Sequence, residues 1–85
     1  FAYPVMGLVG EAGEVANKVK KMYRDGLSRK TVRETISAEL GDVLWYLAAV
    51  ASEFDLNLDD IATNNLEKLE SRRERGVISG NGDNR

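Results

Sequence analysis

Four acidic residues stand in two pairs, and the members of each pair are three residues apart. Glu11 and Glu14 form the first pair, in the stretch GLVGEAGEV, and Glu39 and Asp42 form the second, in SAELGDVLWYL. Residues three apart lie one turn apart on the same side of an α-helix. Two such pairs on facing helices would surround one point with carboxylate oxygens, which are ligands that Mg²⁺ prefers. The spacing therefore predicts a magnesium site formed by all four acids.

The first acid of each pair occupies a position in an apolar stripe. Glu11 follows Leu8 by three residues and precedes Val15 by four, and Glu39 stands in the same register within the second apolar pattern. A buried carboxylate without a partner is costly, and like charges one turn apart repel each other. A bound cation would remove both penalties. We therefore favour a metal site over a chance arrangement of surface acids.

A second set of polar residues lines one side of the C-terminal helical pattern. Asn65 takes a position in its apolar stripe, and Lys68 and Arg72 follow three and seven residues later. Arginine offers a bidentate fork to phosphate oxygens, and lysine offers a compact point charge. Taken alone, such a segment is most often a solvated helix end. Beside a cation site, we interpret these residues as phosphate ligands.

The first two of three predicted helices follow from apolar periodicity and end signals. Pro4 suits a first helical turn, and the pattern that follows ends at Asp25 and Gly26, where glycine can adopt the left-handed conformation. Thr31 and Glu34 fit a capping box that opens the second helix. The two apolar stripes comprise Leu8, Val15, Val19 and Met22, and Val32, Ile36, Val43, Leu47, Val50 and Phe54.

A third helix begins at Asn57 with Asp60 and ends at Gly76, and its apolar residues are Leu58, Ile61, Leu66 and Leu69. We predict an all-α domain over residues 1–76, with three main helices per chain, and a Gly/Asn-rich tail over residues 77–85. A chain of this size supports only a small core. We therefore expect oligomerisation to complete a four-helix-type bundle core.

Glycines accompany the acids. Gly7, Gly10 and Gly13 recur every three residues, and Gly41 lies between the two acids of the second pair. Glycine in a helix interior lowers stability, so these positions predict close approach of another helix or room for a ligand.

Three other side chains receive structural interpretations. Trp45 and Tyr46 could stack on a nucleotide base, but we place them in the core. Lys18 follows Glu14 by four residues, which predicts an ordinary ion pair within the helix.

Composition excludes several classes of site. Cysteine and histidine are absent, which rules out disulfides and the usual zinc ligands and leaves oxygen-bound magnesium, manganese or calcium. The net charge of −2 argues against nucleic-acid binding. There is no membrane-length apolar run and no signal-peptide pattern, so we expect a cytoplasmic protein. Because the chain begins at Phe1, we expect its start to be trimmed.

The stretches GLVGEAGEVANKVKK and ELGDVLWYLAAVASEFDLNLDDIATNNLEKLESRRERG resemble the MazG-like nucleotide pyrophosphohydrolases of the all-α NTP pyrophosphatase superfamily. The shared motif is E-x-x-E followed, after a spacer, by E-x-x-D. The resemblance implies hydrolysis of nucleoside triphosphates, including dNTPs or non-standard NTPs, to the monophosphate and pyrophosphate. It also implies a role in nucleotide-pool cleaning and assembly into a homodimer or homotetramer. The chain departs from the family in one respect, because relatives usually carry a helix before the first acid motif.

The resemblance also implies roles for individual residues. Mg²⁺, with Mn²⁺ as a substitute, would be held by Glu11, Glu14, Glu39 and Asp42. Glu11 is our choice of general base, Lys68 and Arg72 would act in catalysis, and Asn65, Lys68, Arg72 and Arg73 would bind the nucleotide.

Three other functions stay open at this point. One is the related phosphoribosyl-ATP pyrophosphohydrolase activity, although ELGDVLWYLAAVA favours the MazG-like family. Another is a non-catalytic helical oligomerisation module whose acids bind a structural cation. A nucleotide-binding sensor without turnover lies between them, and magnesium-dependent turnover would separate the enzymes from both binding proteins.

Overall fold

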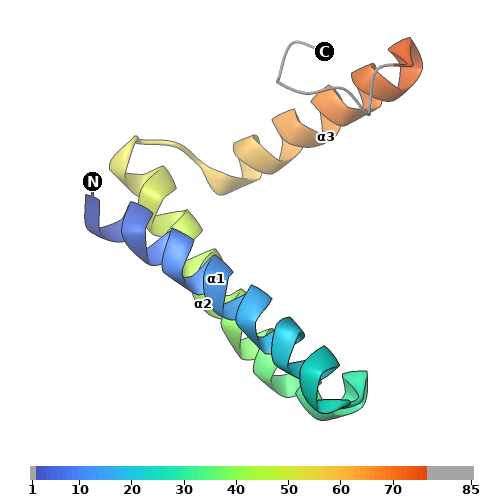
Figure 1. Ribbon diagram of the computed structural model, residues 1–85. Coiled ribbons are helices and arrows are strands. Elements are labelled where there is room, and N and C mark those ends of the chain that lie inside the picture. The colour runs from blue at the N-terminus through green and yellow to red at the C-terminus, as the bar shows by residue number, and fades with distance from the viewer. Residues whose placement is uncertain (1, 77–85) are drawn as a thin grey trace. The chain divides into compact units, whose positions relative to one another are not determined.

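The computed structural model describes residues 2–76, which form three α-helices (Figure 1). These are α1 (Ala2–Asp25), α2 (Arg29–Glu53) and α3 (Leu58–Arg75). No strand occurs within the described range, so the all-α prediction is confirmed. The predicted tail, residues 77–85, lies outside the described residues. The chain divides into two compact units, Phe1–Asp55 with α1 and α2, and Leu56–Arg85 with α3.

A tight connection joins α1 to α2. Gly26 adopts the left-handed conformation with φ 66°, as predicted, and the amide of Leu27 donates a 2.9 Å hydrogen bond to the carbonyl of Met22. Ser28 then caps α2, because its Oγ accepts a 3.1 Å hydrogen bond from the amide of Thr31. The prediction that Thr31 is the cap is therefore wrong. The helix begins one turn earlier, because the extended backbone of Ser28 presents its hydroxyl to that amide.

Helices α1 and α2 pack side by side as an antiparallel hairpin (Figure 1). Their facing residues, which we call the seam, alternate at spacings of three and four, as in knobs-into-holes packing. All of them are half-buried. The seam comprises Leu8, Glu11, Val15, Lys18 and Met22 on α1, and Val32, Ile36, Glu39, Val43, Tyr46 and Val50 on α2.

The hydrophobic core of the described chain is small. Ala51 is its one fully buried apolar residue. Leu47 and Phe54, which the apolar stripe of the second helix included, remain 38% and 57% exposed. The seam therefore joins two helices without enclosing a full core, which is the outcome expected for so short a chain.

Gly7 allows a close contact between α1 and α2. A Cβ atom added there would lie 2.6 Å from Cζ of Tyr46, far inside the normal contact distance. The prediction of close helix approach is thus confirmed at Gly7. In the described structure, a Cβ added at Gly10, Gly13 or Gly41 would have no heavy atom within 4 Å apart from its chain neighbours and the nearby backbone of its own helix.

Helix α3 has the ends that the sequence predicts. The side chain of Asn57 accepts a 3.2 Å hydrogen bond from the amide of Asp60, and Gly76 terminates the helix with φ 73°. Acidic residues in the first turn and arginines in the last complement the helix dipole. None of the three helices combines the length and the hydrophobicity that crossing a bilayer requires.

Candidate active site

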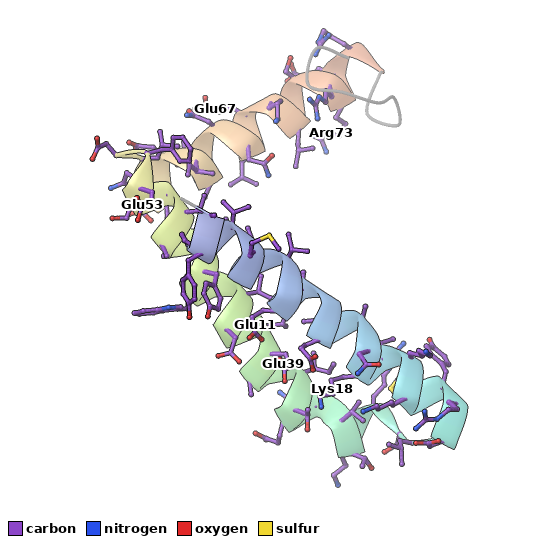
Figure 2. The ribbon with its side chains drawn as sticks, turned by 60° about the vertical axis from the view of Figure 1, so that its left-hand side comes forward. Glu11, Lys18, Glu39, Glu53, Glu67 and Arg73 are labelled. Atoms are coloured by element: carbon purple, nitrogen blue, oxygen red, sulfur yellow. The ribbon has the colours of Figure 1, made fainter. Side chains whose placement is uncertain are left out.

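Three of the predicted metal ligands converge on the seam. Glu11 from α1 and Glu39 and Asp42 from α2 each offer a carboxylate oxygen, and these oxygens lie within 4.8 Å of one another. Figure 2 shows Glu11 and Glu39 where the two helices meet. Glu11 and Glu39 are half-buried, whereas Asp42 is exposed. We call these three residues the acid cluster. One side of the cluster is therefore open to solvent and to a ligand.

Glu14, the fourth predicted ligand, lies outside the acid cluster. It is exposed, because three residues after Glu11 the helix has turned its side chain to the flank of the seam. Its charge nevertheless reaches the cluster, since it helps to raise the pKa of Glu11. The structure thus brings together three of the four acids and places Glu14 beside them.

The neighbouring acids oppose the ionisation of Glu11. The pKa of Glu11 is raised above its ordinary value of 4.5, first by the surrounding protein, which displaces water. A hydrogen bond with Glu39 and the negative charges of Asp42, Glu39 and Glu14 raise it further. A proton or a cation would relieve this repulsion.

The spacing of the acid cluster fits a magnesium ion. Oxygen ligands that lie about 2.1 Å from Mg²⁺ in an octahedron are about 3 Å apart when adjacent and about 4 Å apart when opposite. The 4.8 Å limit on the oxygen separations in the cluster needs only small side-chain adjustments to meet this geometry. The residues present therefore suit an oxygen-bound divalent cation.

The raised pKa of Glu11 predicts a pH-dependent stability for the metal-free protein. A raised pKa in the folded state gives stability that is fully present below the ordinary value of 4.5 and is lost as the pH rises through the raised value. In EDTA, the melting temperature of the wild type should therefore fall relative to Glu11→Gln as the pH increases from about 4 to about 8. Adding Mg²⁺ at the higher pH should restore the wild type. Parallel curves for the two proteins would contradict the repulsion.

Tyr46 is a candidate site residue that the sequence analysis assigned to the core. It lies on the seam, and its ring centroid is 6.3 Å from that of Tyr3. A hydrogen bond with Tyr3 raises the pKa of its hydroxyl, and the charges of Glu11 and Asp42 add to this effect. The hydroxyl thus lies within the electrostatic field of the acid cluster. The signal in the sequence was its spacing, four residues after Asp42.

Trp45 and Lys18 differ from their structural predictions. Trp45 is 71% exposed, so its assignment to the core is wrong in this chain. Lys18 is half-buried on the seam, and no ion pair joins it to Glu14 within residues 2–76. The one-turn spacing permits that pair, but Lys18 lies half-buried on the seam, whereas Glu14 is exposed to solvent.

The predicted nucleotide ligands lie on α3. Asn65, Lys68 and Arg72 share one side of the helix, since they are three and four residues apart. Asn65 is exposed, Lys68 is half-buried and Arg72 is only 3% exposed. Arg73 points elsewhere and forms an exposed ion pair with Glu70 at 2.6 Å.

The model of the MazG nucleotide pyrophosphohydrolase domain matches residues 4–77. The chain belongs to the MazG family. It is 55% identical over 87 residues to the "Gene 37 protein" of Mycobacterium phage L5, and the match covers 100% of this chain and 76% of the phage protein. No solved structure matches the chain.

Membership of the MazG family gives the activity class, which is nucleotide pyrophosphohydrolysis with nucleotides as substrates. MazG proteins typically depend on divalent cations, in accord with the acid cluster. The matched range contains the whole cluster and all of α3. The resemblance recognised in the sequence is confirmed.

Proposed function

We propose that the protein hydrolyses nucleoside triphosphates, either dNTPs or non-standard NTPs, to the monophosphate and pyrophosphate. Residues 1–76 form the catalytic domain in this proposal. The observation that carries it is the convergence of Glu11, Glu39 and Asp42 inside the segment that matches the MazG domain. Carboxylates gathered on a half-buried seam are costly unless a cation accompanies them.

In this proposal the acid cluster holds Mg²⁺, or Mn²⁺ as a substitute, and Glu14 completes the site as a further ligand. The metal ion supplies electrostatic stabilisation of phosphate charge and lowers the pKa of a bound water. Glu11 is assigned as the general base, because it lies on the seam and its carboxylate is within 4.8 Å of the other oxygens of the cluster.

The cationic residues of α3 bind the phosphates in this proposal. Lys68 and Arg72 stabilise the negative charge that develops on the departing pyrophosphate, and Asn65 hydrogen-bonds to the nucleotide. Arg73 also contributes to nucleotide binding, which requires its surface pair with Glu70 to open. An exposed pair of this kind is weak enough to open readily.

The test is pyrophosphate release from a panel of ordinary and modified NTPs and dNTPs, measured with Mg²⁺, with Mn²⁺ and with EDTA. We expect release from one or a few nucleotides, and we expect EDTA to stop it. If no nucleotide releases pyrophosphate and circular dichroism shows that the protein is folded, the proposal fails. The protein would then be a non-catalytic helical module that binds a cation.

We also propose that the protein acts as a homodimer or homotetramer, in which a second hairpin completes a four-helix core. Apolar side chains next to the seam support this proposal. Val5 and Val9 repeat on α1, and Leu40, Leu44 and Leu47 repeat at helical spacing on α2, all at least 38% exposed. Such rows are unfavourable in water and are typical of subunit interfaces.

Replacing Leu44 with aspartate should weaken assembly, because the carboxylate would enter an apolar interface. Sedimentation or light scattering should show a shift from the oligomer toward the monomer at the same protein concentration. Leu27→Asp is the matched control, since Leu27 is also exposed but lies in the connection between α1 and α2. Equal behaviour of the two variants would place the interface elsewhere.

A further inference from the structure

Lys18 occupies an unusual position on the seam. It follows Val15 by three residues and precedes Met22 by four, so it stands where the stripe would otherwise carry an apolar side chain. Lys18 and Lys21 are half-buried, whereas Lys20 and Arg24 on the same helix are exposed, and of the two half-buried lysines only Lys18 falls on the seam. Partial burial of an ammonium group among apolar residues costs free energy. A functional contact would offset that cost.

The position of Lys18 directs it toward the acid cluster. Lys18 follows Glu11 by seven residues, which is nearly two full turns, so the two residues lie almost in line along α1. Long side chains on a helix lean toward its N-terminus, which here is the direction of the cluster. Figure 2 shows Glu11, Glu39 and Lys18 along the line where α1 and α2 meet.

The ammonium group does not reach the carboxylates themselves. Seven residues span about 10 Å along the helix axis, and the extended side chain of a lysine covers about 6 Å. The separation along the axis is therefore longer than the lysine side chain, which leaves a gap between Lys18 and Glu11. In agreement, no ion pair within 4.0 Å joins Lys18 to a carboxylate in residues 2–76.

A phosphate group bound through a metal ion would fill this gap. Phosphate oxygens coordinate Mg²⁺ at about 2.1 Å, and an ammonium group donates to a phosphate oxygen at about 2.8 Å. A phosphate chain held at the cluster by a cation would bring further phosphate oxygens toward the ammonium group of Lys18. A simple counter-ion would instead pair directly with Glu14 or Glu39, and Lys18 does neither within the described chain.

We infer that Lys18 is a substrate-binding residue, which holds the polyphosphate chain of the nucleotide on the side of the acid cluster nearer the α1–α2 connection. The inference rests on the proposed function and adds to it a phosphate ligand from the seam itself.

The test compares Lys18→Met, Lys18→Arg and Lys20→Met. Methionine keeps an unbranched side chain of similar length without the charge, arginine keeps the charge, and Lys20 is an exposed control with the same change in net charge. We expect Lys18→Met to raise KM for the nucleotide at least about 10-fold, as for the loss of one charged hydrogen bond. Lys18→Arg should recover most of this loss, and Lys20→Met should resemble the wild type.

Two binding measurements separate this inference from other outcomes. Calorimetry should show that Lys18→Met binds Mg²⁺ alone at least as tightly as the wild type, but binds magnesium pyrophosphate at least about 5-fold more weakly. Equal loss in both measurements would show that the substitution disrupts the structure of the seam and would overturn the inference, as would identical kinetics of Lys18→Met and Lys20→Met. If the wild type binds magnesium pyrophosphate but turns over no nucleotide, the proposed function fails while the pyrophosphate comparison still decides the role of Lys18. If it neither binds magnesium pyrophosphate nor turns over a nucleotide, both fail; if it turns over nucleotides without measurable pyrophosphate binding, the kinetic comparison decides the role of Lys18.

Discussion

Replacing Glu39 with glutamine should reduce metal-dependent pyrophosphate release by about 100- to 1,000-fold, the range for losing one group that stabilises charge in a transition state. The amide has nearly the same volume but no negative charge, so it is a much weaker ligand for Mg²⁺. Glu39 lies on the seam, and its carboxylate oxygen is within 4.8 Å of the other oxygens of the acid cluster. It is half-buried, whereas Asp42, the other acid that α2 contributes to the cluster, is exposed. Initial-rate measurements at saturating Mg²⁺ would record the loss.

The same variant should be more stable than the wild type when metal is absent. Removing one charge from the acid cluster reduces the repulsion that raises the pKa of Glu11. Melting curves in EDTA would therefore separate loss of function from loss of folding. Glu34→Gln is the matched control, because Glu34 is an exposed acid on the same helix. If Glu39→Gln retained full activity, the assignment of the site would be wrong.

Replacing Gly7 with alanine should destabilise the α1–α2 hairpin by about 1–3 kcal/mol, as for overpacking at other close contacts. The added Cβ would overlap the aromatic ring of Tyr46, which is rigid and cannot bend out of the way. Either the ring must leave its place beside the acid cluster or the two helices must separate. Urea or thermal unfolding would measure the loss, and activity should fall with it.

Gly10→Ala is the matched control for this prediction. It makes the same chemical change on the same helix, but no described atom of α2 lies within 4 Å of the new Cβ. Alanine favours helix over glycine by up to about 1 kcal/mol, so this variant should be slightly more stable than the wild type. If the free energy of unfolding changed by the same amount and in the same direction in both variants, the contact between Gly7 and Tyr46 would not contribute to stability.

The sequence predicted the helices well, because periodicity and end signals are local. The cap at Asn57 and the left-handed glycines at 26 and 76 appear as expected. The cap at Ser28 was missed because Ser28 and Thr31 both have the chemistry of a cap, and only the backbone conformation decides between them. Sequence spacing alone does not carry that information.

The candidate site was predictable to the extent that residues share a helix face. The register placed Glu11 and Glu39 on the seam, and the structure confirms it. The same spacing could not show that Glu14 would remain exposed, or that Tyr46 would rest on Gly7 beside the acids. Trp45 was misplaced for a related reason: an apolar residue in a helix need not face the neighbouring helix of its own chain.

The short connection between α1 and α2 affects how early the site can form. All three cluster residues belong to one hairpin, and only residues 26–28 separate its two helices. Closing a small loop carries a low entropic cost, and helical hairpins with local contacts belong to the fastest class of folding structures. During synthesis, the growing chain contains the complete acid cluster once α2 has been made, before any of α3 is added. For the proposed metal site, this order predicts that cation binding takes part in folding from its first stages.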